Sequence, residues 1–328
     1  MGDYNNARMP RYSMKQFRII ILFAGLLFFY TTNGQHIPVR SAAFYNVENL
    51  FDEVNDPAAD DGDFTPEGIY GWTVDRFWEK KERIARVVAA IGTDLIGLAE
   101  VENHIVLDNL IAVPALKELD YNYIHFDSPD PRGIDVALLY RPAYFRPETM
   151  HPVRYSLIPH YRTREVLHVS GRWRGHPVHI LVCHFPSVLS LKSVRNAAAE
   201  SVRQYADSLL AADPDHLLLV MGDFNANPGD RPMKILTRNG GLENPFYPLY
   251  RQGYGTYHYR GRWNMYDSIL WGGTGPGEPA AKIFIRDYLI QSDGIYKGYP
   301  YRSFSGTEYI AGYSDHLPVV LIWSEAAY

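Results

Sequence analysis

The stretch that decides the fold is Leu217-Leu218-Leu219-Val220-Met221-Gly222-Asp223-Phe224-Asn225. Its first five residues form a continuous apolar run, which is typical of a strand buried on both faces of a sheet. Polar residues follow at once, at Asp223 and Asn225. A lone carboxylate is costly in a protein core unless it has partners. The end of this strand therefore predicts a polar cleft at one edge of a sheet.

Four more apolar strands carry a polar side chain at or beside one end. They are residues 39–47 before Glu48, 95–99 before Glu100, 178–183 before His184, and 317–323 after Asp315 and His316. Carboxylates that converge in one cleft repel each other, and a divalent cation relieves that repulsion. Oxygen ligands from Asp, Glu and Asn predict Mg²⁺, Mn²⁺ or Ca²⁺ rather than Zn²⁺ held by thiolates. Two histidines beside such a cation form a set of groups suited to phosphate chemistry.

Two helices and further strands separate these motifs. Residues 75–91 predict an amphipathic helix whose charged face includes Lys80 and Lys81, and residues 191–211 predict a second helix. Residues 52–71 and 226–261 are expected to be mainly loops. The single cysteine, Cys183, excludes an intrachain disulfide and is expected in the core. The other strands are expected at 121–126, 134–140, 165–173, 177–184, 266–270 and 283–290.

The N-terminal residues have the features of an export signal. Lys15 and Arg18 precede an apolar run at 19–30, and small and polar residues follow up to Gly34. That run is too short to cross a bilayer comfortably, and a buried or anchoring helix is the alternative. We therefore expect a signal peptide at 1–34 and a single domain at 35–328. The mature protein is expected to be exported, monomeric and without stable membrane insertion.

The charge of the chain limits its partners. The sequence has 32 basic and 37 acidic residues, a formal net charge of −5. Residues 1–34 hold four basic residues and one acidic residue, so their removal leaves a net charge of −8. An acidic protein is not a general polyanion binder. It can still cleave phosphodiesters if a metal ion and a local basic cluster offset the charge of the substrate.

The order of these motifs resembles that of the endonuclease/exonuclease/phosphatase superfamily, and most closely its secreted bacterial members. The resemblance covers roughly residues 40–324 and implies a DNase I-like, four-layer α/β sandwich of two packed, mostly antiparallel sheets flanked by helices. The motifs that carry it are Tyr45-Asn46-Val47-Glu48-Asn49, Gly97-Leu98-Ala99-Glu100-Val101-Glu102-Asn103, Arg132-Gly133-Ile134-Asp135-Val136-Ala137-Leu138, Cys183-His184-Phe185-Pro186-Ser187, Gly222-Asp223-Phe224-Asn225, Tyr266-Asp267-Ser268-Ile269-Leu270 and Ser314-Asp315-His316.

The resemblance implies a metal site. Glu100 would be the main ligand, and Asn46, Glu48 and Asp315 would complete the site directly or through water. The expected ion is Mg²⁺ or Mn²⁺, with Ca²⁺ as a third candidate.

The resemblance also implies a catalytic set. Asp223 and Asn225 would orient the attacking water and the scissile phosphate. His316, oriented by Asp267, would act as general base or stabilise the phosphate. His184 would contact the phosphate or protonate the leaving oxygen.

Three further residues are candidates for binding the substrate phosphate. They are Arg132, Arg195 and Ser187. Guanidinium groups bind phosphate in a bidentate manner, but structural salt bridges would account for the two arginines equally well.

Three functions are consistent with these motifs. The first is a phosphodiesterase or endonuclease that acts on DNA or RNA. The second is a phosphatase, or a phosphodiesterase for lipid head groups, with Phe246, Tyr247 and Tyr250 as candidate apolar contacts. The third is an exported binding module without catalysis, which the complete catalytic set disfavours. A nucleic-acid groove would use Arg251, Tyr254, Tyr257, Tyr259, Arg260, Arg262 and Trp263.

Overall fold

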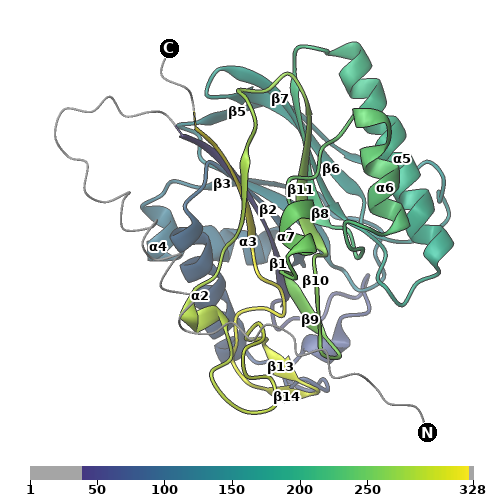
Figure 1. The fold of residues 1–328 in the computed structure, drawn as a ribbon. Coiled ribbons are helices and arrows are strands. Elements are labelled where there is room, and N and C mark those ends of the chain that lie inside the picture. Colours follow the sequence, from purple (N-terminus) through teal and green to yellow (C-terminus); the bar gives the residue numbers. More distant parts are fainter. Residues whose placement is uncertain (1–38, 325–328) are drawn as a thin grey trace, which may run out of the picture.

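Two β-sheets stacked face to face form the centre of the protein, and helices cover the outer face of each sheet (Figure 1). The computed structural model describes residues 39–324. The signal peptide predicted at 1–34 lies outside this range.

The first sheet has six strands, and all its neighbouring pairs are antiparallel except β1 with β2. The central strand β1 is buried on both faces: Phe44 points toward the second sheet and Tyr45 toward the helices. In spatial order the strands are β12 (Ala280–Ile283), β15 (Val319–Ser324), β1 (Val39–Leu50), β2 (Leu95–Val101), β4 (Asp135–Tyr140) and β3 (Asn122–His125).

The second sheet has five strands, with β7 and β8 as its parallel pair. All seven residues of β8 are buried, as the apolar run from Leu217 predicts. In spatial order the strands are β11 (Asp267–Gly273), β8 (Leu217–Asp223), β7 (His176–His184), β6 (Val166–Trp173) and β5 (Phe145–Val153).

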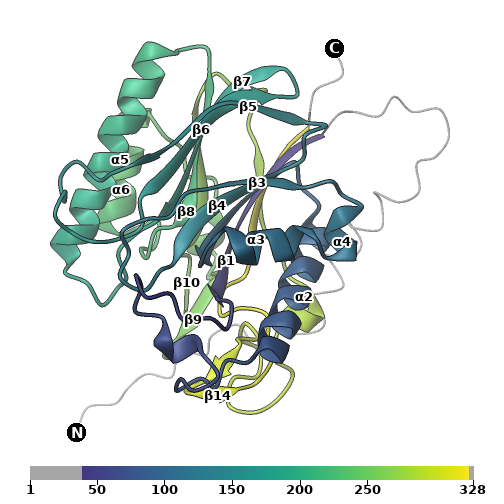
Figure 2. The same ribbon diagram turned by 180° about the vertical axis from the view of Figure 1, so that it is seen from behind.

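Helices complete the outer layers on both sides (Figure 2). Apolar side chains that alternate along each strand fill the space between the sheets on one face and contact the helices on the other. Gly97 allows the two sheets to approach closely, because a Cβ atom there would be 2.6 Å from the sulfur of Met221. The helices over the first sheet are α2 (Val74–Ile91), α3 (His104–Ile111) and α4 (Pro114–Lys117), and those over the second are α5 (Lys192–Ala212) and α6 (Arg231–Thr237). The expected four-layer sandwich is confirmed.

Short elements at the surface differ from the sequence-based expectation. The strand expected at 283–290 ends at Ile283, and a 3₁₀ turn (Asp287–Leu289) follows it. Strand β5 was not expected, because it is an edge strand whose residues are mostly exposed and include two prolines. Residues 226–261, expected to be loops, also hold regular structure. This comprises α6, the 3₁₀ turn Arg238–Gly240, α7 (Tyr247–Arg251) and β9 (Tyr257–Tyr259), which pairs with β10 (Arg262–Asn264).

Two other small elements complete the described chain. A 3₁₀ turn (Gly62–Phe64) lies in the loop between β1 and α2, and β13 (Phe304–Ser305) pairs with β14 (Glu308–Tyr309). None of the helices within residues 39–324 combines the length and the apolar character needed to cross a membrane.

Candidate active site

Strand order brings the predicted polar residues to one end of the sandwich. The parallel strands β1 and β2 end there, as do β7 and β8, and the antiparallel strand β11 begins there. Asp223 is in register with His184 on one side and with Asp267 on the other. We call six of the predicted residues the active-site cluster, and hydrogen bonds or separations of less than 4 Å connect them: Asn46, Glu100, His184, Asp223, Asp267 and His316.

Glu100 enters the cluster through a distortion of its strand. Its φ of 65° lies in the left-handed region, which is unusual for a residue with a side chain. The pairing of β2 with β4 shifts register between Ala99 and Val101, so one residue is bulged out. Val101 consequently faces the same helix-side core as Ile96 and Leu98, although strict alternation would point it the other way. Such strain costs of order 1–3 kcal/mol and is found mainly at functional sites.

Asn46 connects the two sheets at this end of the sandwich. Its Nδ2 donates to Glu100 Oε1 over 3.2 Å and to Asp223 Oδ2 over 3.1 Å. The backbone nitrogen of Asn49 donates to the other oxygen of Glu100 over 3.0 Å. The side-chain hydroxyl of Ser314 donates to the Asn46 carbonyl and accepts from the His316 backbone nitrogen. These bonds fix the carboxylates of Glu100 and Asp223 beside each other.

Asp267 and His316 form a buried ion pair. His316 Nδ1 donates to Asp267 Oδ2 over 2.7 Å, and its Nε2 faces Asp223 Oδ2 at 3.8 Å. Burial alone would lower the pKa of His316, but the Asp267 carboxylate and other nearby acids raise it well above its usual value. The ring of Tyr257 covers His316, with 4.8 Å between ring centroids. The sequence predicted that Asp267 would orient a histidine. In the structure Asp267 accepts a hydrogen bond from the His316 ring, as that role requires.

His184 lies on the other side of Asp223 and is electrically neutral. Its Nε2 is 3.9 Å from Glu100 Oε1 and 3.7 Å from Asp223 Oδ2. Burial and the charges of Arg164 and Arg132 hold the pKa of His184 well below its usual range. Its Nδ1 is buried without a hydrogen-bond partner among the described residues.

Burial also raises the pKa of Asp223, to about 7. This carboxyl group is fully enclosed, and Asp267 adds negative charge beside it, while His316 and the donors Asn46 and Asn225 act in the opposite direction. Asp223 therefore titrates near neutral pH in the absence of a bound cation.

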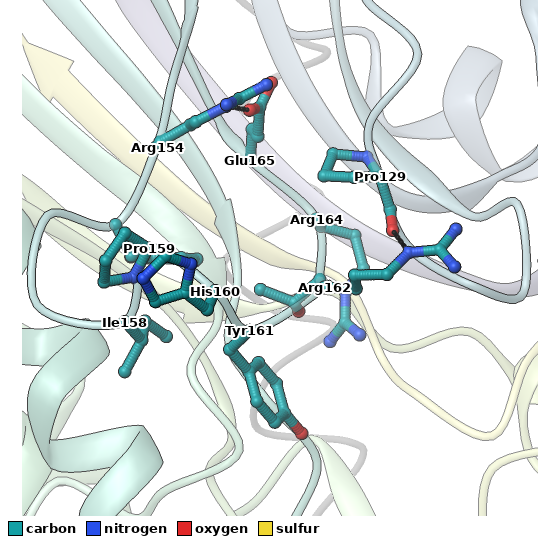
Figure 3. Close-up of a pocket in the computed structure, with 11 residues that line it drawn as sticks. Pro129, Arg154, Ile158, Pro159, His160, Tyr161, Arg162, Arg164 and Glu165 are labelled. Carbon is teal, nitrogen blue, oxygen red and sulfur yellow. Dashed lines mark hydrogen bonds and ion pairs between the residues drawn. The ribbon is translucent and has the colours of Figure 1, made fainter.

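Arg164 is a site residue that the motifs did not reveal. It is buried, donates to Asp130 Oδ2 over 2.8 Å, and donates to the Phe185 carbonyl next to His184 over 2.7 Å. Figure 3 shows the cavity of about 130 Å³ beside this segment, where Arg162 contacts Pro129 and Arg154 pairs with Glu165. No residue of the active-site cluster lines this cavity, so it is not the cleft in which the carboxylates meet.

Glu48 forms a buried pair with Lys80. The position predicted for Lys80 from the sequence is wrong. Lys80 was expected on the charged face of its helix, but the structure buries it completely. Its Nζ lies 4.0 Å from Glu48 Oε2 and donates to the Ser303 hydroxyl and the Tyr313 carbonyl. Burial raises the pKa of Glu48 to about 7 and lowers that of Lys80 to about 8. Lys81, also expected on the charged face, is buried too, because its ammonium group lies 3.1 Å from the ring centroid of Trp78.

The other predicted site residues have varied surroundings. Asp315 pairs with Arg302 over 2.8 Å and has one oxygen 3.9 Å from His316 Nε2. Asn225 uses its backbone nitrogen to bond Asp223 Oδ1 and its side-chain amide to bond the Phe185 carbonyl, so it orients Asp223. Arg132 is half-exposed, with its Nε 3.5 Å from Asp130 Oδ1.

Arg195 and Ser187 hold a loop in place instead of pointing at the carboxylates. Arg195 donates to the carbonyls of Ser187 and Ser190, and the Ser187 hydroxyl accepts from the Leu189 backbone nitrogen. Arg195 therefore has a structural role, although its partners are backbone carbonyls and not the acidic side chains of the salt bridge that was the open alternative. Cys183 is buried in the core beneath α5, as expected.

The residues present fit a divalent cation. The carboxylates of Glu100, Asp223 and Asp267 lie within the cluster, and Asn46 holds those of Glu100 and Asp223 beside each other. His184 is neutral and adds no positive charge. A hard divalent ion bound by oxygen atoms would reduce the repulsion between these carboxylates. Glu100 is the carboxylate best placed to bind it, with its side chain about one-sixth exposed.

Solved structures show what this fold is similar to. A mannosyl-6-phosphatase from Bacteroides thetaiotaomicron is 19% identical, with a TM-score of 0.57 over 86% of this chain and 98% of that chain. The human Nocturnin catalytic domain is 17% identical, with a TM-score of 0.57 over 87% and 94%. A humanized D. rerio TDP2 is 12% identical, with the same TM-score over 87% and 98%. No curated protein matches the sequence.

A comparison at the level of families covers the same part of the chain. Residues 41–325 match the Endonuclease/Exonuclease/phosphatase family. This range includes the part of every strand that supplies a residue of the active-site cluster. Enzymes of this family hydrolyse phosphate esters and generally use divalent metal ions. The chain therefore belongs to the endonuclease/exonuclease/phosphatase family.

Proposed function

We propose that this protein is an exported, divalent-metal-dependent phosphoester hydrolase that acts primarily as a phosphodiesterase or endonuclease. The observation that carries the proposal is the contact of Asp223 with Asn46, His184 and His316, with Glu100 bonded to the same Asn46. A metal-binding carboxylate, an acid/base pair and phosphate-facing histidines are the groups that this hydrolysis needs.

Glu100 would hold the metal ion, with Asn46, Glu48 and Asp315 completing the site directly or through water. When bound, Mg²⁺ or Mn²⁺ would withdraw charge from the phosphoryl oxygens. Ca²⁺ is the third candidate, since it also prefers oxygen ligands.

The electrostatics favour a division of roles between Asp223 and His316. His316 is protonated near neutral pH, so its Nε2 would donate a hydrogen bond to a phosphate oxygen. Asp223, whose pKa is raised to about 7, would accept the proton of the attacking water. Asn225 would keep Asp223 oriented, and neutral His184 would contact the phosphate on its other side.

Two cavities near the cluster differ in the charge of their lining residues. This difference affects which substrates each cavity would bind. One of about 310 Å³ includes Asp315 and is lined by Tyr259, Arg260, Tyr299 and Arg302, which suits an aromatic base or a sugar with its phosphate. Tyr259 and Arg260 are among the residues predicted for a nucleic-acid groove. A D. rerio TDP2 structure of this fold holds a single-strand DNA product, so DNA and RNA are the first substrates to test.

A second candidate function is a phosphatase for a small phosphate ester. The larger cavity, of about 770 Å³, begins at Glu102 and Asn103 and is lined mainly by acidic and apolar residues, including Asp52, Asp56 and Trp78. Such a surface repels a long polyanion but accepts an uncharged leaving group, such as a sugar or a lipid glycerol. The mannosyl-6-phosphatase of the same fold is named for a substrate of this kind.

Export and oligomeric state are part of the proposal and rest on the sequence. The basic and apolar pattern at 1–34 supports a signal peptide, and the mature protein would be a monomer without stable membrane insertion.

The test is hydrolysis by the purified protein of plasmid DNA, RNA, bis-p-nitrophenyl phosphate and a hexose 6-phosphate. Each is assayed with Mg²⁺, with Mn²⁺ and with EDTA, for the protein and for His316→Ala. His160→Ala is the matched control, because His160 is exposed and outside the cluster. We expect metal-dependent cleavage of diesters that His316→Ala loses and His160→Ala retains. Hydrolysis of the monoester alone would establish the phosphatase, and no hydrolysis of any substrate would favour the binding module.

A further inference from the structure

A second group of polar side chains lies under α5, away from the active-site cluster. His151, His168 and His179 come from the neighbouring strands β5, β6 and β7, and Tyr205 comes from α5 above them. We call these four residues the histidine row. The strand neighbours of His168 and of His179 belong to the core between the two sheets. Since successive strand residues point to opposite faces, these two histidines face the helix layer.

The histidine row is a continuous hydrogen-bonded chain. His168 Nδ1 lies 2.8 Å from the Tyr205 hydroxyl, which lies 3.1 Å from His151 Nε2. His168 Nε2 lies 3.0 Å from His179 Nδ1. His179 is therefore held through one ring nitrogen, and its other nitrogen, Nε2, points outward to Asp213 Oδ2 at 3.1 Å.

The turn between α5 and β8 completes a set of three ligand residues around His179 Nε2. The His216 backbone nitrogen bonds to the Asp213 carbonyl, so this turn brings the two side chains together. The His216 ring stacks on His179 with 4.8 Å between centroids, and its Nδ1 is buried without a hydrogen-bond partner among residues 39–324. One ligand atom from each of His179, Asp213 and His216 lies within 4.8 Å of the others.

We propose that His179, Asp213 and His216 bind a transition-metal ion of the zinc class at a second site, separate from the active site. Two imidazoles and one carboxylate are a donor set that suits Zn²⁺, with water at the fourth position. Closure on the ion would draw the three ligand atoms closer together, and the Asp213 side chain, about two-fifths exposed, has room to move.

The hydrogen bond between His179 Nδ1 and His168 Nε2 distinguishes this group from ordinary polar packing. A histidine that ligates a metal almost always donates its other ring N–H to a partner, and His168 Nε2 lies 3.0 Å from His179 Nδ1 as the acceptor of that bond. The bound ion would join β7 to the turn before β8 and so stabilise the end of the second sheet at which β8 begins. His179 precedes His184 by five residues on β7, roughly 16 Å along the strand, and faces the opposite side of the sheet.

The experiment is a calorimetric titration of the full chain with Zn²⁺ in saturating Mg²⁺, which occupies the oxygen-rich active site. Asp213→Asn and His216→Asn remove ligands, and Asp215→Asn is the matched control in the same turn. We expect the first two variants to weaken zinc binding by more than about 10-fold, since loss of an outer partner alone costs 10–100-fold. His168→Gln should fall in that 10–100-fold range, and Asp215→Asn and Glu100→Gln should bind zinc as the unchanged protein does.

NMR of the histidine rings gives a readout that needs no variant. Zinc should shift the ring signals of His179 and His216 at one equivalent, and Mg²⁺-dependent hydrolysis should be the same in Asp213→Asn and Asp215→Asn. Three results would each overturn the proposal. They are unshifted His179 and His216 signals, equal loss of zinc affinity in Asp213→Asn and Asp215→Asn, or zinc binding abolished by Glu100→Gln.

Discussion

The active-site cluster and the histidine row are both buried groups of polar residues, but the fold builds them differently. The cluster lies where strands end, and its member Glu100 has a left-handed φ, as do the adjacent Glu48 and Asn225. The three histidines of the histidine row lie on strands β5, β6 and β7 and Tyr205 on α5, and none of the four has a positive φ. The first group therefore depends on strained backbone, whereas the second needs only the regular alternation of strand residues.

The two groups also differ in charge. The cluster combines carboxylates with a histidine whose pKa is raised, and it carries an excess of negative charge. In the histidine row, burial and the neighbouring histidines lower the pKa of His168 to about 3, so that ring is neutral near neutral pH. A hard cation suits the first environment, and a borderline transition metal suits the second. Replacing one residue in each region tests whether this difference is functional.

The largest expected effect separates the two regions by catalysis. His316→Ala removes the proton donor that faces Asp223, so kcat for bis-p-nitrophenyl phosphate should fall by about 10²–10⁴-fold. His168→Gln should keep kcat within a few-fold, since His168 touches no residue of the cluster in the described structure. Steady-state rates in saturating Mg²⁺ measure both. A comparable loss of kcat in both variants would mean that the histidine row is not independent of the active site.

The next effect concerns the buried pair behind the cluster. Lys80→Met leaves the Glu48 carboxylate enclosed without its cation, which should lower the free energy of unfolding by about 3–5 kcal/mol. Lys81→Met is the control from the same helix, because it loses cation–π contacts with Trp78 and Phe77, for which we expect about 1 kcal/mol. Urea unfolding gives both values. Adding Glu48→Gln to Lys80→Met should restore part of the loss, and no recovery would show that the two side chains are not coupled.

Local patterns predicted the strands and the meeting of their polar ends, and the family resemblance supplied the four-layer arrangement. Apolar runs define β1, β2, β7 and β8, and a polar residue at the end of each strand indicates the shared edge. The family motifs then supplied Asp267 and His316, whose contact joins residues 49 positions apart.

The sequence did not predict features that depend on tertiary contacts. Lys80 looks like a surface residue because a helix period cannot show that Ser303 and Tyr313 cover it. Arg164 lies in a segment without regular structure and gains its role only by reaching Phe185. The histidine row was missed because its members come from three strands and β5 was not expected. One available signal was Asp213-Pro214-Asp215-His216, a short turn with ligand residues three apart.

A smaller effect is a pH dependence of stability that comes from the histidine row. The folded pKa of His168, about 3, lies below its ordinary value of 6.5, and the groups that face it are His151, His179 and Tyr205. Between these two values the unfolded chain binds a proton that the folded chain does not, so stability falls as the pH falls. At pH 5 the loss should be roughly 2 kcal/mol.

Urea unfolding at pH 7.5 and pH 5 in EDTA measures this loss, and His168→Gln is the comparison. The difference in unfolding free energy between the two pH values should be smaller by about that amount in the variant. An equal difference in both proteins would show that His168 is protonated in the folded state.

The smallest effect tests the backbone contrast itself. At Glu100, with φ 65°, glycine relieves strain that alanine keeps, so Glu100→Gly should be more stable than Glu100→Ala by about 1 kcal/mol. At His168, in a regular strand, the order should reverse, with glycine less stable than alanine by about 0.5–1 kcal/mol. Both Glu100 variants should lose Mg²⁺-dependent activity. Glycine would therefore be more stable than alanine only in the strained region, where both substitutions abolish function. If glycine and alanine have the same order at both positions, the left-handed backbone at Glu100 stores no strain, and the carboxylate alone sets the cost of building the active site.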